Sequence, residues 1–201
     1  MKLYLSFLFT SLIIVATLNS IFLPDGYSIL SMWLYTWINA VIIFGLDALI
    51  ATLIHALPRK WFDPYNKIFH IYKWENKFLT NGMKIMKWKD KIPELGKLTT
   101  NFSKGSIDNT TPDYLYYFLV ETCYAGCIHL FMALIGIIII FINPIDLSIC
   151  IMLPLVIINF VLNIPPILIQ RLNRPKLLRI YELELRKTSL KKQSDNIVVN
   201  Q

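Results

Sequence analysis

Four ionisable side chains lie within, or at the border of, long apolar stretches of this sequence: Asp47, His55, Glu121 and His129. Such side chains are costly to place in a lipid bilayer and by default mark functional sites. A neutral imidazole takes a proton from a hydroxyl group, and a carboxylate orients the imidazole or the hydroxyl. This set of residue types is therefore typical of general acid–base chemistry.

The residues around His129 predict where its side chain points. At 100° per residue, several small residues lie within about 60° of it on one helix face. They are Thr122, Ala125, Gly126, Ala133 and Gly136. Small residues let a second helix approach closely, so we expect His129 to face the interior of a helix bundle. Glu121 lies about 80° around the same helix and about 12 Å along it. A histidine in such a place also serves purely to join helices by hydrogen bonds, and this alternative stays open.

The remaining ionisable groups carry weaker signals. His55 lies just before the basic Pro58-Arg59-Lys60 segment and is a second candidate site residue. Asp47 lies deeper in its apolar stretch and has no evident partner in the sequence, so we expect a structural role for it. Cys123 and Cys127 lie near His129, but three potential ligands without a fourth do not predict a metal site.

The apolar stretches that carry these residues predict an all-α, polytopic membrane protein. Of the 201 residues, 55% are hydrophobic and only 16% are charged, whereas soluble domains carry about 25% charged residues. Four stretches reach the roughly 20 residues that cross a bilayer as a helix. They cover residues 3–23, 29–57, 114–142 and 147–170. The first also resembles a secretory signal, but no small-x-small cleavage motif follows it, which favours a retained helix.

The basic residues predict the orientation of these spans. All 20 Lys and Arg residues lie at position 2, between residues 58 and 112, or after residue 170. The positive-inside rule then places both termini, the loop 58–112 and the basic tail 171–201 in the cytoplasm. The net charge of +7 then faces the anionic headgroups of the cytoplasmic leaflet and requires no nucleic acid as a partner.

Two further helices are expected on the cytoplasmic face. Aromatic residues and lysines alternate at helical spacing between Tyr65 and Leu79, which predicts an amphipathic helix on the inner leaflet. Arg174-Pro175 predicts a break after the fourth span, followed by a second basic amphipathic helix. Thr111-Pro112-Asp113 predicts the start of the third span.

Polar residues gather where the fourth span reaches the cytoplasm: Gln170, Arg171, Asn173 and Arg174. The planar guanidinium group of arginine suits phosphate and carboxylate groups. Snorkelling of the arginines to lipid headgroups is the alternative interpretation.

Three motifs occur in order between about residues 60 and 180. They are Trp88-Lys89-Asp90-Lys91-Ile92-Pro93, then Glu121-Thr122-x-x-Ala125-x-x-x-His129, then Asn163-x-Pro165 followed by Gln170-Arg171-x-Asn173-Arg174-Pro175. Together they resemble the glycosyl-4,4'-diaponeurosporenoate acyltransferase family, small bacterial membrane proteins of carotenoid (staphyloxanthin) biosynthesis. The chain departs from the family pattern at Gly126, where the family carries an acidic residue.

The resemblance implies transfer of a fatty acyl group to a hydroxyl of a membrane-embedded glycolipid or glycosylated carotenoid-like acceptor. The donor would be of the acyl-CoA or acyl carrier protein type, and no cofactor is implied. His129 would be catalytic with Glu121 assisting, and the cluster Gln170, Arg171, Asn173 and Arg174 would bind the donor. His55, Lys89 and Asp90 are secondary candidates. The competing function is a non-catalytic membrane assembly, immunity or lipid-binding protein.

Overall fold

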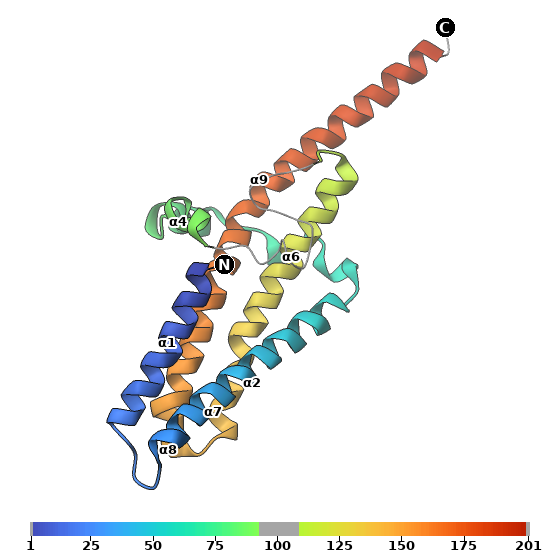
Figure 1. Cartoon of the computed structure of the whole chain (residues 1–201). Coiled ribbons are helices and arrows are strands. Elements are labelled where there is room, and N and C mark those ends of the chain that lie inside the picture. Colours follow the sequence, from blue (N-terminus) through green and yellow to red (C-terminus); the bar gives the residue numbers. More distant parts are fainter. Residues whose placement is uncertain (1, 93–108, 200–201) are drawn as a thin grey trace.

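Four long helices form the body of the protein. The structure, a computed structural model, describes residues 2–92 and 109–199, and these residues form helices and turns without a β-strand. The long helices are α1 (Lys2–Ile21), α2 (Ile29–His55), α6 (Pro112–Ile135) and α9 (Leu153–Val199). They lie side by side as a bundle, and the C-terminal part of α9 extends beyond it (Figure 1). The all-α prediction is confirmed.

Short helical segments make the connections. Between α2 and residue 92 they are η1 (Arg59–Phe62), η2 (Lys67–Phe69), α3 (Lys73–Lys77), η3 (Phe78–Gly82), α4 (Ile85–Trp88) and η4 (Lys89–Lys91). Between α6 and α9 they are α7 (Ile138–Ile142), α8 (Ile145–Leu147) and η5 (Ser148–Met152). Residues 93–108, which belong to the loop expected over 58–112, lie outside the described residues.

Three helical segments are long and apolar enough to cross a membrane: Ile29–His55, Pro112–Ile142 and Ile145–Lys191. They lie over the second, third and fourth predicted spans, and the prediction of a membrane protein is confirmed. Leu5–Ile21 is a shorter apolar helix. The whole of α1 has 20 residues, which is about 30 Å at 1.5 Å per residue and about the thickness of the hydrocarbon layer.

The long helices begin where their capping residues predict. Ser28 and Ser31 form a reciprocal capping box at the start of α2, in which the Ser31 amide donates to the Ser28 hydroxyl over 3.2 Å. Pro112 is the first residue of α6, as expected, although the Thr111 side chain makes no capping hydrogen bond.

The small-residue face of α6 packs against α9, as the sequence predicts. A Cβ atom on Gly126 would lie 3.4 Å from Nη2 of Arg174, and one on Gly136 would lie 2.5 Å from Nδ2 of Asn159. The second distance leaves no room for any side chain at residue 136. Glycine at this position therefore allows the polar side chain of α9 to reach α6.

The break predicted at Arg174-Pro175 is wrong, because α9 is continuous through that proline. Buried side chains hold the helix on both sides of Pro175. Leu172 packs with Leu79 and Ile85 from the short segments that follow α2. Leu177 packs with Leu115 and Leu119 of α6. This packing offsets the loss of one backbone hydrogen bond at the proline.

The single amphipathic helix expected between Tyr65 and Leu79 is also wrong, because this stretch forms η2, α3 and the first residues of η3 with turns between them. Asn66 caps η2 by accepting a hydrogen bond from the Ile68 amide over 3.2 Å. The carbonyl groups of Ile68 and His70 accept hydrogen bonds from Arg171. Because these carbonyl groups accept hydrogen bonds from a side chain of α9, they do not accept from backbone amides to continue a helix.

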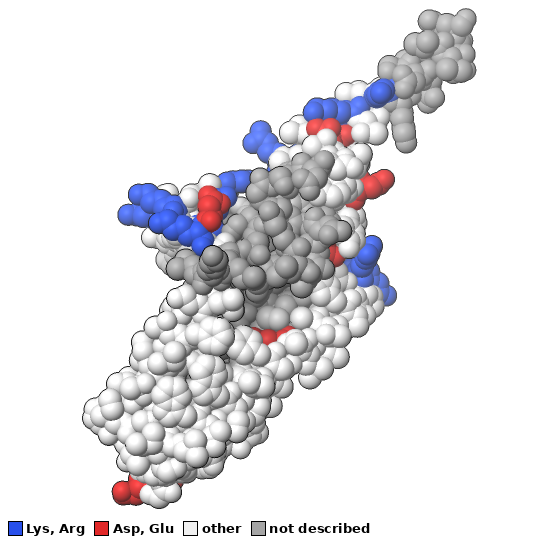
Figure 2. Space-filling view, in the orientation of Figure 1, with Lys and Arg blue, Asp and Glu red and all other residues white. Residues whose placement is uncertain are grey.

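The charges separate along the bundle. Figure 2 shows a face on which the bundle is almost free of charged atoms, with Lys and Arg around the end where α4 lies and acidic groups at the opposite tip. This separation agrees with the distribution of basic residues in the sequence.

Candidate active site

A polar cluster joins α6 to α9 inside the bundle. Nδ1 of His129 lies 2.8 Å from Oδ1 of Asn163. The Asn163 amide nitrogen donates to the carbonyl oxygen of Asn159 over 3.0 Å and to its Oδ1 over 2.7 Å. Nδ2 of Asn159 donates to the carbonyl oxygen of Met132 over 2.8 Å. Both asparagines are buried, so each amide is held in one orientation by partners on both sides.

These contacts determine the tautomer of His129. The amide oxygen of Asn163 only accepts hydrogen bonds, and its nitrogen is already used as a donor to Asn159. Nδ1 of His129 must therefore carry the proton, which leaves the lone pair on Nε2. A neutral imidazole with a free Nε2 is the form that a general base requires.

Asp47 reaches the same cluster from α2. Asn163 interacts with the Asp47 carboxylate as well as with His129. Asp47 of α2 thus lies close to the asparagine that contacts His129.

Glu121 lies apart from this cluster. It interacts with Tyr117, whose ring is covered by the Arg59 guanidinium at 4.9 Å. Among the described residues no hydrogen bond joins Glu121 to His129, and the two are eight residues apart along α6. Glu121 therefore does not orient the imidazole in this structure.

His55 belongs to an aromatic stack at the end of α2. Its ring stacks on that of Tyr124 with 5.1 Å between centroids. The Phe62 ring also stacks on Tyr124, with 3.8 Å between centroids. The Tyr124 hydroxyl donates to the carbonyl oxygen of Leu57 over 2.8 Å. The stack joins α2, η1 and α6, and among the described residues no hydrogen bond or ring contact links it to His129.

Arg171 connects α9 to the short helical segments that follow α2. Its Nη2 donates to Glu75 Oε2 over 2.8 Å and to the His70 carbonyl oxygen over 3.0 Å, and Nε pairs with the other carboxylate oxygen. Hydrogen bonding from Arg171 holds the pKa of Glu75 below its usual range, although partial burial acts in the opposite direction. Arg171 thus has a protein partner 96 residues away in the sequence.

The Glu75–Arg171 pair predicts a pH dependence of stability. Because the Glu75 pKa is lower in the folded protein, the pair stabilises the fold above the unfolded pKa of about 4.3. This contribution is lost as the pH falls through the folded pKa. We expect Glu75→Gln to be less stable than wild type at pH 7 and to lose less stability on acidification, measured by thermal unfolding in micelles.

Glu184→Gln is the matched control, because Glu184 pairs with the exposed Lys187 within one helix. It should change neither the stability nor its pH dependence by much. Equal acid sensitivity of wild type and Glu75→Gln would contradict the prediction.

Arg174 is buried inside the protein, with 3% of its surface exposed, and does not lie on the surface of the bundle. Its Nε and Nη2 donate to the side chain and carbonyl oxygen of Thr122 over 3.2 and 2.8 Å, and Nη1 donates to the Phe69 carbonyl oxygen over 3.1 Å. No carboxylate pairs with it within the described parts of the chain. Arg174 borders a pocket of about 160 Å³ together with His70, Arg179 and Glu182.

The other predicted site residues lie at the same end of the protein. Gln170 and Asn173 are half-buried on the turns of α9 that carry the two arginines. Lys89 and Asp90 lie in η4 and form an ion pair of 3.8 Å, in which Asp90 is largely exposed.

Comparison with known proteins identifies the family of the chain. The family model of the glycosyl-4,4'-diaponeurosporenoate acyltransferases matches residues 58–183. The chain belongs to this family. No curated protein and no solved structure matches the chain.

The acyltransferase family match covers most of the polar residues described above. His129, Asn163, Arg171 and Arg174 lie within the matched range, whereas Asp47 on α2 precedes it. The family is one of acyltransferases in carotenoid biosynthesis, which implies an acyl donor and a glycosylated acceptor.

Two groups of site residues were not predicted from the sequence. Asn163 is the partner of His129 and is itself held by Asn159, and Glu75 is the partner of Arg171. A signal existed for the asparagines, since two amides spaced by four residues in an apolar helix lie on one face. No sequence pattern indicated Glu75 as a site residue, because its partner Arg171 is distant in the sequence.

Proposed function

We propose that this family member transfers a fatty acyl group from a cytoplasmic thioester donor to a hydroxyl group of a membrane-embedded glycosylated lipid, with His129 as the proton acceptor. The observation that carries the proposal is the 2.8 Å contact between His129 Nδ1 and Asn163 Oδ1, which leaves Nε2 unprotonated. Asn163 takes the orienting role that the sequence had suggested for Glu121.

The reaction follows from this tautomer. Nε2 of His129 takes the proton of the acceptor hydroxyl while its oxygen attacks the acyl carbonyl carbon. The carbon–sulfur bond of the thioester then breaks, and the departing thiolate receives the proton from the imidazolium. The products are an ester of the glycosylated lipid and the free thiol of coenzyme A or of the deacylated acyl carrier protein.

The donor is proposed to bind at the end of the bundle that carries the basic residues. Arg174 and Arg179 border the same pocket, and guanidinium groups suit the phosphates of such a donor. Arg171 supports this pocket indirectly, because it holds the His70 carbonyl and Glu75 in place. Gln170 and Asn173 lie beside it on α9, and Glu121 lies beside Arg59, where it is proposed to contact the acceptor headgroup.

The direct test is acyl transfer by the purified protein in liposomes. The donors are palmitoyl-CoA and palmitoyl-acyl carrier protein, the acceptor is a long-chain alkyl glucoside, and mass spectrometry detects the ester. Ester formation that depends on the protein supports the proposal. Absence of ester with both donors, when glycolipid extracts also serve as acceptors, would indicate a non-catalytic member of the family.

We also propose that the protein is a multi-pass protein of the bacterial cell membrane with both termini in the cytoplasm. The basis is the position of all 20 Lys and Arg residues. In a background with the native cysteines replaced, a membrane-impermeant maleimide should label Asp25→Cys and Asp146→Cys in intact cells. Lys87→Cys should react only after lysis, and its labelling in intact cells would refute this topology.

A further inference from the structure

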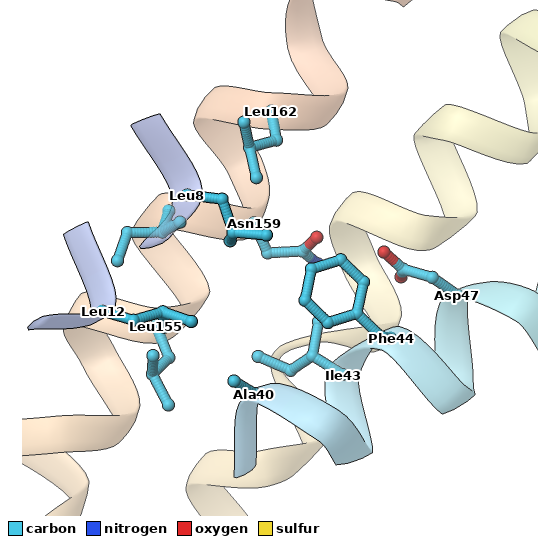
Figure 3. A pocket seen from close by; sticks show the side chains of 10 residues that line it. Leu8, Leu12, Ala40, Ile43, Phe44, Asp47, Leu155, Asn159 and Leu162 are labelled. Atoms are coloured by element: carbon cyan, nitrogen blue, oxygen red, sulfur yellow. The ribbon is translucent and has the colours of Figure 1, made fainter. Parts of the chain in front are cut away.

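The recess beside Asp47 inside the helix bundle is small. Figure 3 shows Asp47 at its border, with Asn159 across from it and leucines of α1 and α9 further along. Its volume is about 20 Å³, which is room for about one water molecule. A lipid chain does not fit in this recess, whereas the outer surface of the protein carries groups suited to lipid headgroups.

The short helices α3, η3, α4 and η4 form one lysine-rich segment, residues 73–91. Figure 1 shows this segment to one side of the bundle, near the level at which α1 begins. Its inner side packs against α9, because Leu79 and Ile85 are 2% and 0% exposed and share an apolar cluster with Ile169 and Leu172. Since α1 is about as long as the hydrocarbon layer is thick, the segment lies near the level of the lipid headgroups.

The outer side of the lysine-rich segment exposes aromatic rings. Glu75 and Leu79 are one helical turn apart and face α9, where Glu75 pairs with Arg171 and Leu79 is buried. Trp74 and Phe78, each one position earlier, are therefore neighbours on an adjacent face. They are 71% and 56% exposed. Neighbouring exposed rings mark an interaction surface, and tryptophan in particular favours the level of lipid headgroups.

Positive charge surrounds these rings. The lysine-rich segment contains six lysines and two acidic residues, and both acidic residues have basic partners, Glu75 with Arg171 and Asp90 with Lys89. Within the described parts of the chain, four of the lysines form no salt bridge: Lys73, Lys77, Lys84 and Lys87. Figure 2 shows basic atoms gathered where α4 lies. An excess of lysines beside exposed aromatic rings is complementary to an anionic lipid surface.

The backbone of Lys84 provides a separate observation. Its φ of 49° and ψ of 40° are left-handed, and among the described residues it is the one non-glycine residue with a positive φ. A residue with a Cβ atom adopts this conformation at a cost, whereas glycine adopts it freely. A lysine at a position that suits glycine favours a function for its side chain.

We propose that the outer side of the lysine-rich segment binds anionic phospholipids, with the lysine ammonium groups against the headgroup phosphates and Trp74 and Phe78 at the level of the headgroups. The exposed rings favour a lipid surface over an acidic protein as the occupant. This inference rests on the proposed placement of the helices in the membrane and does not depend on acyl transfer. Because Glu75 of the same segment holds Arg171, lipid binding connects the bilayer surface to the end of α9 at which the donor is proposed to bind.

The test compares two lipids that differ in headgroup charge. Native mass spectrometry of the full chain in dodecyl maltoside micelles measures the dissociation constants of phosphatidylglycerol and phosphatidylcholine. We expect phosphatidylglycerol to bind at least about fivefold more tightly. Lys77→Gln should weaken its binding about fivefold, which is the effect of one basic side chain near an anionic surface. Lys187→Gln is the matched control, because Lys187 pairs with Glu184 in α9, and it should bind as wild type.

Lys84→Gly separates lipid binding from folding. It removes a charge and also relieves the left-handed backbone. We expect it to weaken phosphatidylglycerol binding about fivefold without lowering the thermal unfolding temperature. A loss of binding in a protein of unchanged stability cannot result from unfolding, and it would support the proposal.

Three results would overturn the proposal. The first is equal dissociation constants of the two lipids in the wild type. The second is equal phosphatidylglycerol binding by Lys77→Gln, Lys84→Gly and Lys187→Gln. The third is binding of acyl carrier protein that Lys84→Gly weakens while phosphatidylglycerol binding stays unchanged, because the surface would then dock a protein. Labelling of Lys87→Cys in intact cells would refute the proposed topology alone, since the lipid measurement does not depend on the side of the membrane.

Discussion

His129→Ala is expected to lower the rate of acyl transfer by at least about 100-fold, because removal of a general base typically costs a factor of 10²–10⁴. In the native protein Asn163 fixes the proton on Nδ1, so the Nε2 lone pair is available in every molecule. Alanine offers no proton acceptor at this position. The measurement is initial-rate ester formation in liposomes at saturating donor and acceptor.

Two variants serve as controls for His129. His55→Ala removes the other histidine candidate, which stacks on Tyr124 away from the cluster, and should retain most of the transfer rate. Asn163→Ala keeps the imidazole but no longer fixes which ring nitrogen carries the proton. We therefore expect an intermediate effect, a decrease of about tenfold in the transfer rate. Near-full turnover of a folded His129→Ala protein would assign His129 to helix packing instead.

Arg174→Met is expected to destabilise the fold by about 3 kcal/mol, because it removes charge-assisted hydrogen bonds from buried groups. The guanidinium joins Thr122 of α6 and the carbonyl oxygen of Phe69 to α9. Methionine retains much of the length of the side chain but donates to neither, so the Phe69 carbonyl oxygen loses its side-chain donor. Unfolding in mixed micelles, followed by circular dichroism, measures the loss.

The matched control is Arg179→Met on the same helix, because Arg179 is exposed and borders the same pocket. It should leave stability within about 0.5 kcal/mol of wild type. If both residues bind the donor, each variant should also raise the concentration of acyl-CoA needed for half-maximal rate. Equal stability of the two variants would contradict the structural role of Arg174.

Local patterns in the sequence were sufficient for the helical membrane fold and for the direction of His129. The length of the apolar stretches and the absence of charge determine which segments enter a bilayer, and no tertiary contact is needed to read them. Helical periodicity likewise placed the small residues around His129 on one face, and Gly126 and Gly136 do face α9. These properties depend on residues close together in one helix.

Only the tertiary structure decided the partners of the polar residues. Which residue of α9 faces His129 depends on the register and rotation of two packed helices, and the spacing within either helix does not determine these. The pairing of Arg171 with Glu75 spans 96 residues, and Arg174 is buried because the chain before α6 folds over it. Pro175 stays within a helix for the same reason, since packing on both sides of it outweighs the local preference to end the helix.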